Sequence, residues 1–291
     1  EQIESQCVRL ARECEHMQPG IKVARSIRAG TWYRVCEELK SQLTGRTVTN
    51  YTRTMRLVMK GCGHQRMAQD FTNASVALAR LSRKGTKQPI TDDYLNEVLS
   101  LCQRRRDPHQ REALPVLIGL MRFVGLRVQE ARMANKSAIP NLKRLETSTV
   151  VFVRDGTKGG RYRDVVLTPE DVPLVRHLLN ESIRLAAKFG SLWPGANGRK
   201  AQHSLAEALR SVGLKGKFSP HSLRYRFAHE QAMTYQRQGF DEAVAIEHTA
   251  MDLGHGGARR DLMIGTYYQK QHRGVVRAGR ATNQSVATTE Q

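Results

Sequence analysis

A single stretch of the chain, residues 149–167, is typical of β-structure, and it restricts the folds that the chain can adopt. Two segments rich in valine, 149–154 and 163–167, flank a turn that contains Asp155-Gly156 and Gly159-Gly160. Valine favours strands and glycine permits a tight reversal, so this pattern predicts an antiparallel hairpin. The remaining sequence shows helical spacing of apolar residues or the composition of loops. We therefore expect a mainly α fold with one small antiparallel β-hairpin sheet.

The charge of the chain indicates what kind of partner it binds. Lysine and arginine number 47 against 27 aspartate and glutamate residues, which gives a formal net charge of +20. Such an excess favours a polyanionic partner, of which nucleic acid is the commonest. No segment has the roughly 20 apolar residues of a membrane span, so no membrane partner is expected. The chain begins at Glu1 and not at methionine, which leaves a preceding N-terminal arm open.

The cysteines and the missing ligand motifs indicate that the protein holds no metal and no cofactor. The cysteines are odd in number and form no Cys-x-x-Cys pair, which favours free thiols in a reducing cytoplasm. Cys62-Gly63-His64 lacks the further ligands of a zinc site. Neither a phosphate-binding glycine loop nor a carboxylate cluster for two-metal catalysis is evident. The cysteines are Cys7, Cys14, Cys36, Cys62 and Cys102.

A polar, basic segment, LSRKGTKQP at residues 81–89, has the glycine and proline of a linker and divides the chain into two domains, 1–88 and 89–291. The first domain has helical spacing throughout. In residues 47–60, for example, the apolar side chains form one stripe and Thr47 stands where an N-cap is expected. The other faces of this helix carry basic residues that we expect to face either solvent or nucleic acid. They are Arg46, Arg53, Arg56 and Lys60.

The second domain contains several helix signals. The sequence Thr-Asp-Asp at 91–93 predicts a helix start, because threonine caps and acidic side chains suit the positive end of the helix dipole. Apolar residues at helical spacing in 114–124 predict a buried helix that Gly125 ends. After the hairpin, Thr168-Pro169 predicts another helix start. The polar residues 281–291 are expected to form a disordered tail.

Five short motifs carry residues suited to chemistry on a phosphodiester. Negative charge grows at a phosphodiester during substitution, and arginine can hold two of its oxygens with a charge that persists at any working pH. Residues three apart on a helix share a face, so one phosphate can touch both a histidine and an arginine at that spacing. A tyrosine that attacks phosphorus conserves the bond energy in a phosphotyrosyl link. The motifs are Gly125-Leu126-Arg127, Thr157-Lys158-Gly159-Gly160, His221-Ser222-Leu223-Arg224, Leu253-Gly254-His255 and Gly265-Thr266-Tyr267-Tyr268.

The order and context of these motifs resemble the tyrosine recombinases, the lambda-integrase-like family, over most of the chain after its first third. The resemblance implies a helical core-binding (DNA-binding) domain at 1–88 and an α+β catalytic domain with a C-terminal tail at 89–291. It also implies an integrase of a mobile element that cleaves and rejoins DNA through a 3′-phosphotyrosyl intermediate. Such a protein would work without a cofactor, in association with DNA in a prokaryotic cytoplasm.

By the same resemblance, Arg127 and Arg224 would hold the scissile phosphate, with assistance from His221 and His255. Arg224 and His221 also stand at the start of an expected helix, where unpaired backbone N–H groups attract anions. Glu130, three residues after Arg127, matches the acidic residue that supports the active-site arginine in the family.

The expected hairpin adds three basic residues. Lys158 stands at its glycine-rich tip, from which an ammonium group can reach a groove of DNA, and the resemblance implies that it protonates the departing 5′ oxygen. In the family hairpin a lysine precedes an arginine by five residues and then an aliphatic strand, which is the pattern of Lys158, Arg163 and residues 165–167. Arg161 and Arg163 are therefore expected to contact DNA.

The nucleophile departs from the usual family spacing. The tyrosine normally follows the Leu-Gly-His histidine by nine residues, and Ile264 occupies that position. Tyr267 and Tyr268 are both candidates. An aliphatic and then a small residue normally begin the run before the nucleophile, and Ile264-Gly265 fulfils this for Tyr268, so Tyr268 is favoured and Tyr267 is the second choice. The polar segment 234–242 is interpreted as an inserted loop in the long interval between His221 and His255.

Two alternatives stay open. A type IB topoisomerase or a telomere resolvase would use the same chemistry, and a catalytically inactive DNA-binding relative would explain the shifted tyrosine. The implied partner is double-stranded DNA that carries recombination sites, bound by a homotetramer. Accessory DNA-bending or directionality factors are further partners that the resemblance allows.

Overall fold

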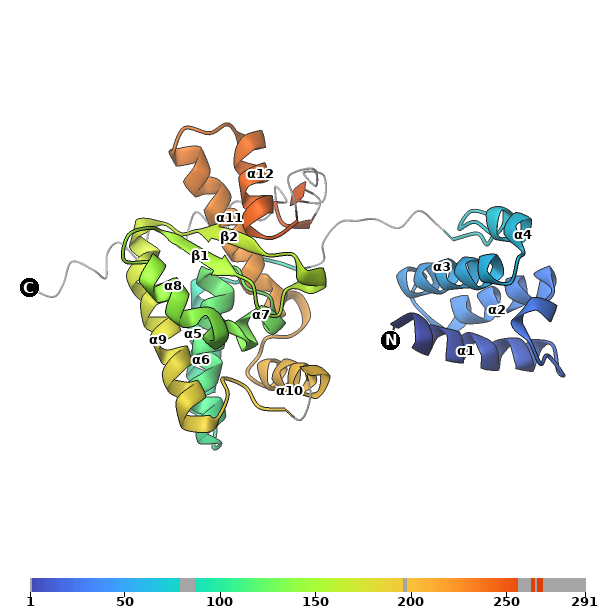
Figure 1. The fold of residues 1–291 in the computed structure, drawn as a ribbon, viewed down its shortest axis with the longest axis horizontal. Coiled ribbons are helices and arrows are strands. Elements are labelled where there is room, and N and C mark those ends of the chain that lie inside the picture. Colours follow the sequence, from blue (N-terminus) through green and yellow to red (C-terminus); the bar gives the residue numbers. More distant parts are fainter. Residues whose placement is uncertain (1, 79–86, 196–197, 256–262, 265, 269–291) are drawn as a thin grey trace, which may run out of the picture. The chain divides into compact units, whose positions relative to one another are not determined.

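The structure is a computed structural model in which residues 2–78, 87–195, 198–255, 263–264 and 266–268 are described. The chain divides into two compact units, Glu1–Ser82 and Arg83–Gln291 (Figure 1). Each has its own cluster of buried apolar side chains. The units are named here the N-terminal unit and the C-terminal unit. Most of the expected linker and the whole of the expected tail lie outside the described residues.

The N-terminal unit is helical, as the spacing of its apolar residues predicts. It consists of α1 (Gln2–Met17), a short 3₁₀ turn (Ala24–Ser26), α2 (Ala29–Gln42), α3 (Gly45–Gly61) and α4 (Gln65–Asp70). Its core joins fully buried side chains of different helices, such as Leu39 and Met55. Among the described residues, no helix combines the length and the apolar character that crossing a membrane requires.

Helix α3 buries the predicted apolar stripe but begins earlier than predicted. The N-cap is Thr44, whose backbone is extended, whereas Thr47 already lies in the first turn, with its Oγ1 3.0 Å from Oγ1 of Thr44. The prediction that Thr47 caps the helix is therefore wrong. The basic residues of this region lie on its outer faces, where Arg56 is half-buried and three side chains are exposed: Arg46, Arg53 and Lys60.

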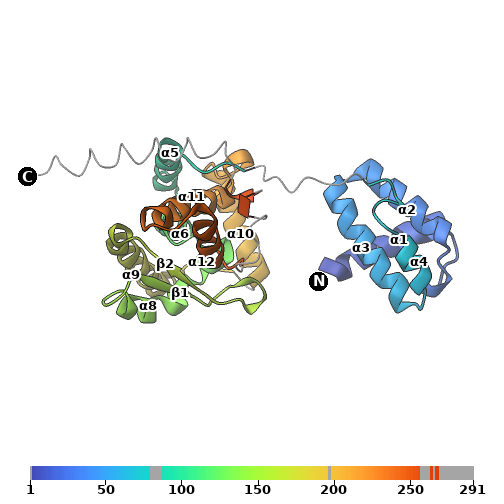
Figure 2. The ribbon, with the colours of Figure 1, turned by 90° about the horizontal axis from the view of Figure 1, so that it is seen from above.

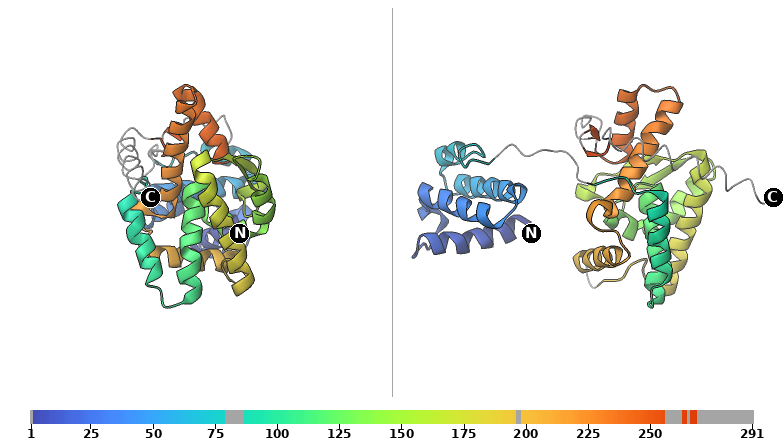
Figure 3. Two further views of the ribbon diagram at one scale, coloured as in Figure 1. Left: turned by 90° about the vertical axis from the view of Figure 1, so that its left-hand side faces the viewer. Right: turned by 180° about the vertical axis from the view of Figure 1, so that it is seen from behind.

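The C-terminal unit is built around α6 (Pro108–Phe123), which packs against α5 (Asp92–Gln103), α9 (Val172–Phe189) and α11 (Pro220–Arg237). Figures 2 and 3 show these helices from above and from behind. Shorter helices complete the unit: α7 (Val128–Arg132), α8 (Ala138–Arg144), α10 (Gly198–Ser211) and α12 (Glu242–Asp252). Short 3₁₀ turns precede α8 (Ala134–Ser137), α9 (Pro169–Asp171) and α11 (Gly216–Phe218).

The predicted helix boundaries around α5 and α6 are confirmed. Thr91 caps α5, and its Oγ1 accepts a hydrogen bond from the backbone N–H of Tyr94 at 3.3 Å. Gly125 follows the end of α6 with φ of +63°, and a Cβ atom at this position would lie 2.5 Å from Cδ1 of Phe227. Only glycine fits this close approach, which leads the chain directly past α11 to Arg127, the N-cap of α7.

The predicted hairpin is confirmed. Strands β1 (Val150–Val153) and β2 (Arg163–Val166) pair antiparallel, with Val150 opposite Val166 and Val153 opposite Arg163. Alternate side chains enter the core, so the hairpin is fixed by its buried face. A 3₁₀ turn at Lys158–Gly160 forms its tip. β2 contacts α12, and its last residues continue through Thr168 into α9.

The segment 234–242 does not form the inserted loop that its polar sequence suggests. Helix α11 continues to Arg237, and α12 begins after Asp241, whose carboxylate accepts a hydrogen bond from the N–H of Val244 at 2.8 Å. Tyr235 and Phe240 lie 6.0 Å apart with their rings edge to face. Aromatic packing and an acidic cap therefore make this region a tight connection between two antiparallel helices.

Candidate active site

The two predicted phosphate-binding arginines donate hydrogen bonds to the same backbone carbonyl. Arg127 donates a hydrogen bond to the carbonyl of Leu253 at 3.1 Å, and Arg224 donates to the same oxygen and to the carbonyl of Gly125. Arg224 is 1% exposed, and burial lowers the pKa of its guanidinium to about 10, which leaves the group charged at neutral pH. Two cations that are far apart in sequence are thus held at one point.

Glu130 holds Arg127 and Arg163 in position. Its carboxylate accepts a hydrogen bond from the side chain of Arg127 at 2.7 Å and two from Arg163 at 2.9 and 2.7 Å. The carboxylate also accepts a hydrogen bond from the backbone N–H of Arg127 at 2.7 Å, and this bond caps α7. Burial acts to raise the pKa of Glu130, but the bonds from Arg163 and Arg127 outweigh it and lower the pKa to about 2. The carboxylate is therefore charged under all physiological conditions.

Arg163 lies inside the protein and not on its surface. Its Nε donates to the carbonyl of Asp252 at 2.6 Å, while its two Nη atoms bind Glu130. The residue is 8% exposed. This geometry does not favour the DNA contact expected for Arg163, because all three nitrogens of its guanidinium already donate to internal acceptors. Instead, Arg163 connects the hairpin to the end of α12 and to Glu130.

His221, His255 and one tyrosine form the second half of the cluster. The Tyr267 hydroxyl lies 3.1 Å from Nε2 of His221 and 3.3 Å from Nε2 of His255. Burial and the positive charges of Arg224, Arg127 and, to a lesser extent, Lys87 lower the pKa of His221 to about 4. His221 is therefore neutral at pH 7 and can accept a proton from the phenol.

Tyr268 points elsewhere. Its ring stacks on that of His229 on α11, with ring centroids 5.0 Å apart and an angle of 23° between the planes. Tyr267, in contrast, packs against Tyr225 and both histidines of the cluster. The structure thus brings the second-choice tyrosine, and not the favoured one, to the predicted phosphate-binding residues.

The hairpin tip carries two exposed basic side chains. Lys158 is exposed there and is followed by two glycines with positive φ, Gly159 and Gly160. No hydrogen bond among the described residues connects Lys158 to the arginines or histidines of the cluster. Arg161 is also exposed, which is consistent with the surface role expected for it.

Two contributors to the site are not among the residues singled out from the sequence. Lys87 donates a hydrogen bond to the carbonyl of Gly216 at 2.7 Å, which places its positive charge near the start of α11. Asp252 accepts hydrogen bonds from Gln231 and Tyr235, both at 2.9 Å. The one signal for Asp252 in the sequence is an acidic residue directly before Leu253-Gly254-His255.

Asp252 fixes the turn whose carbonyls hold the arginines, and its environment makes it sensitive to pH. Burial raises its pKa from 3.8 to about 7, although the bond from Tyr235 opposes this. Between these two pKa values Asp252 is protonated in the native state but ionised in the unfolded state. Protonation of Asp252 therefore stabilises the native state at low pH, and this contribution is lost as the pH rises through 7.

We expect this loss to depend on the carboxyl group of Asp252. From pH 6 to pH 8 it amounts to about 1.4 kcal/mol for a group that titrates near 7 in the native state alone. Urea titrations of the wild type and of Asp252→Asn at both pH values measure this loss in the free energy of unfolding. Subtracting the change in the variant from the change in the wild type removes the contribution of other titrating groups such as His221. Parallel pH dependence in both proteins would exclude Asp252 as the source.

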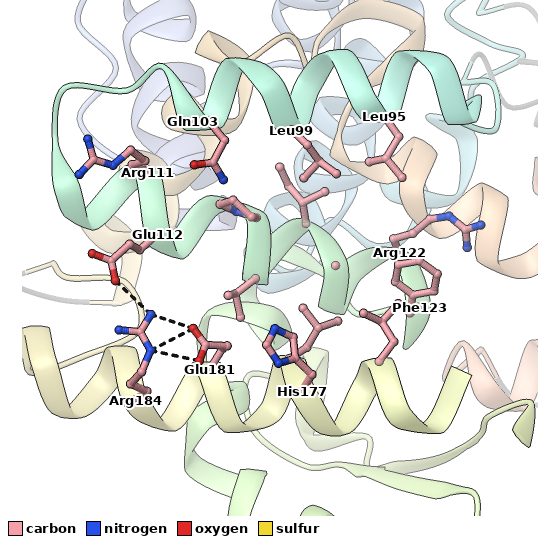
Figure 4. A pocket seen from close by; sticks show the side chains of 16 residues that line it. Leu95, Leu99, Gln103, Arg111, Glu112, Arg122, Phe123, His177, Glu181 and Arg184 are labelled. Carbon is pink, nitrogen blue, oxygen red and sulfur yellow. Dashed lines mark hydrogen bonds and ion pairs between the residues drawn. The ribbon is translucent and has the colours of Figure 1, made fainter. Parts of the chain in front are cut away.

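The two larger cavities among the described residues of the C-terminal unit differ in their relation to the cluster. One, of about 820 Å³, lies between the hairpin and the turn after α12, and His255 contributes to its wall. The other, of about 430 Å³, is an apolar groove between α5, α6 and α9, closed at one end by Arg184 with Glu112 and Glu181 (Figure 4). It contains none of the arginines or histidines of the cluster. Within the described ranges, no group of three histidine, cysteine, aspartate or glutamate residues is arranged to hold a metal.

Comparison with solved structures shows the fold. The Tn1549 transposon integrase in complex with transposon right end DNA matches with a TM-score of 0.55 and 16% identity, over 99% of this chain and 94% of that chain. A lambda integrase tetramer bound to a Holliday junction matches with 0.52 and 13%, over 87% and 70%. The XerH site-specific recombinase bound to its difH substrate matches with 0.52 and 19%, over 96% and 76%. No curated protein sequence matches the chain.

A family model described as integrase matches residues 77–230, which is more than half of the chain. The matched range contains Arg127, Glu130, Lys158 and the His221–Arg224 pair, and it ends before His255 and the tyrosines. The mainly helical fold with a two-stranded antiparallel sheet agrees with this match. The chain therefore belongs to the integrase family, the tyrosine recombinases.

Proposed function

We propose that this protein is a site-specific DNA recombinase that cleaves and rejoins DNA strands with Tyr267 as its nucleophile. The observation that carries the proposal is the position of the Tyr267 hydroxyl between His221 and His255, beside the buried Arg224. Family and fold support DNA recombination in general. The choice of Tyr267 and the roles below are inferred from the geometry of this chain.

The arginines bind the scissile phosphate. Arg127 and Arg224 are held at the Leu253 carbonyl, and Arg127 is also tied to Glu130, which fixes both cations before DNA binds. Arg224 keeps one donor for a phosphate oxygen, its buried Nε–H, which has no hydrogen-bond partner among the described residues. A preorganised pair of guanidinium groups stabilises the charge that develops on the non-bridging oxygens in the transition state. A bound phosphate also adds negative charge near His221, which raises its pKa from the low value of the DNA-free protein.

The bond changes are balanced by groups of this chain. The Tyr267 oxygen forms a bond to phosphorus while the bond from phosphorus to the 5′ oxygen breaks. The phenolic proton passes to neutral His221, and Lys158 on the hairpin tip supplies a proton to the departing 5′ oxygen. The product is a 3′-phosphotyrosyl link and a 5′-hydroxyl end, and the reverse steps rejoin a strand.

The partner is double-stranded DNA. The net charge of +20 suits a polyanion, and the solved relatives are described as bound to transposon end DNA, a Holliday junction and a difH substrate. The N-terminal unit contributes exposed cations along α3, so we assign it to DNA binding and the C-terminal unit, which includes Lys87, to catalysis. Assembly as a tetramer follows from the lambda integrase complex by analogy.

A selection with nicked DNA tests this function. The protein is incubated with a library of duplexes that carry random sequence around a nick, because a nick lets the short 5′-hydroxyl fragment diffuse away and traps the intermediate. Covalent adducts are isolated after denaturation and the attached DNA is sequenced. We expect adducts on one sequence class, formed equally well in EDTA, because a tyrosine nucleophile needs no metal.

Exchange between two duplexes that carry the selected sequence separates recombination from simple relaxation of supercoiled DNA. Relaxation without exchange would point to a topoisomerase. DNA binding without any adduct would identify an inactive relative, and cleavage abolished by EDTA and restored by magnesium would contradict the tyrosine mechanism.

A further inference from the structure

The cavity between the hairpin and the end of α12 adjoins the proposed active site. It has a volume of about 820 Å³ and is called here the hairpin hollow. Arg154 and Tyr162 line it from the two sides of the hairpin, and Met251 and His255 line it from the end of α12 and the turn beyond. His255 also lies 3.3 Å from the Tyr267 hydroxyl, so the hollow and the cluster share a side chain.

Two large apolar side chains are exposed on opposite walls of the hollow. Tyr162 is 69% exposed and Met251 is 48% exposed, although aromatic and thioether side chains usually gain stability by burial. Neither of them contributes to the hydrophobic core of the unit. A flat phenol ring and a polarisable sulfur are suited to contact the face of another ring.

The remaining lining suits an anion. Arg154 and Arg161 are exposed at the hollow, and Asp164 is the one carboxylate among the described residues that line it. Aromatic stacking surfaces combined with cations are the features that bind unpaired nucleotides, because every base has a flat face and every nucleotide carries a phosphate. An intact duplex keeps its base faces covered and can use only the cations.

We propose that the hairpin hollow binds unpaired nucleotides next to the scissile phosphate, on the side that leaves with the free 5′-hydroxyl. The side is chosen because Lys158, proposed to protonate the 5′ oxygen, lies on the same hairpin tip as Tyr162. A strand that is to be exchanged has to leave its duplex, and stacking on Tyr162 stabilises its first bases outside it. The choice of the strand with the free 5′-hydroxyl rests on the proposed function.

Binding to two probes tests the hollow without any need for cleavage. The full chain carrying Tyr267→Phe is titrated with a duplex that contains a short bubble of unpaired thymidines, and with its fully paired counterpart. We expect Tyr162→Ala to weaken binding of the bubble duplex about tenfold, within the range for one base stacked on an aromatic ring, and to leave the paired duplex unaffected. Tyr162→Phe keeps the ring and retains the affinity.

A matched control is Ile139→Ala, which removes another exposed apolar side chain, 58% exposed on α8 and outside the hollow. It is expected to leave both affinities unchanged. When one bubble thymidine is replaced by 2-aminopurine, stacking on Tyr162 quenches its fluorescence, and Tyr162→Ala restores it. Equal affinities of wild type and Tyr162→Ala for the bubble duplex, or equal losses on both probes, would overturn the proposal.

These outcomes are independent of the proposed function. If the wild type forms no covalent adduct with any nicked duplex but Tyr162→Ala still loses affinity for the bubble alone, the hollow binds unpaired DNA in a protein that does not cleave. If adducts form but the bubble effect is absent, cleavage stands and the hollow has no such role. Where both hold, Tyr162→Ala should slow strand exchange more than it slows the first cleavage.

Discussion

Tyr267→Phe is expected to abolish the covalent protein–DNA adduct, whereas Tyr268→Phe is expected to form it at close to the wild-type rate. Both substitutions remove a single phenolic oxygen and preserve the ring, so packing is largely retained. The oxygen of Tyr267 is the one within 3.1 Å of His221 and 3.3 Å of His255. The ring of Tyr268 is stacked on His229 instead.

The measurement is the yield of adduct on a nicked duplex of the selected sequence, separated under denaturing conditions. Each variant serves as the control of the other, because the two residues are adjacent and similarly buried, at 3% and 6% exposure. Affinity for the same duplex should be unchanged in both. Adducts from Tyr267→Phe but not from Tyr268→Phe would return the nucleophile to Tyr268, and adducts from both would place it outside this motif.

A sequence motif alone does not decide between Tyr267 and Tyr268 as the nucleophile. The run Ile264-Gly265 favours Tyr268 by counting residues. Which hydroxyl reaches His221 depends instead on how Tyr267 and Tyr268 pack against α11, where Tyr267 contacts His221 and Tyr225 and Tyr268 points towards His229. This direction is a property of tertiary packing, so the local sequence leaves it open.

Much of the fold of the C-terminal unit could be predicted because its signals are local. Valine-rich segments define the hairpin, Thr91 caps α5 through its own side chain, and Gly125 adopts the positive φ at the end of α6 that favours glycine. The polar composition of 234–242 suggests a loop, because the contacts that stabilise this region, between Tyr235, Phe240 and His248, join α11, α12 and the connection between them and are not visible in the local sequence.

Parts of the site depend on partners that are distant in sequence. Arg163 is a basic hairpin residue, which suggests a DNA contact. The direction of its guanidinium, however, is set by Glu130 and by the Asp252 carbonyl. Asp252 acts through Gln231 and Tyr235 on a helix that the sequence did not show to be continuous. The identity of the catalytic residue types could be inferred from their order, whereas their orientation required the fold.

Glu130→Gln is expected to destabilise the protein strongly and to impair cleavage as well. Glu130 is the counter-charge for Arg127 and Arg163, and its side chain is 0% exposed. A pKa lowered from 4.5 to about 2 corresponds to about 3 kcal/mol, which is present above pH 4.5 and is lost as the pH falls towards 2. Glutamine keeps the shape but leaves two guanidinium groups without a partner charge, and breaking a buried pair costs ~3–5 kcal/mol.

Glu230 offers a matched control, because it too is a carboxylate between two arginines. It pairs with Arg122 at 2.8 Å and with Arg226 at 2.5 Å, and these charges outweigh burial and lower its pKa to about 2. Urea unfolding at pH 7 should show a large loss for both Glu130→Gln and Glu230→Gln. Adduct formation, measured at a temperature where both remain folded, should fall only for Glu130→Gln, because only Glu130 holds an arginine of the proposed phosphate site. If the two variants lose cleavage equally at equal folded fraction, Glu130 acts through stability alone and does not position Arg127.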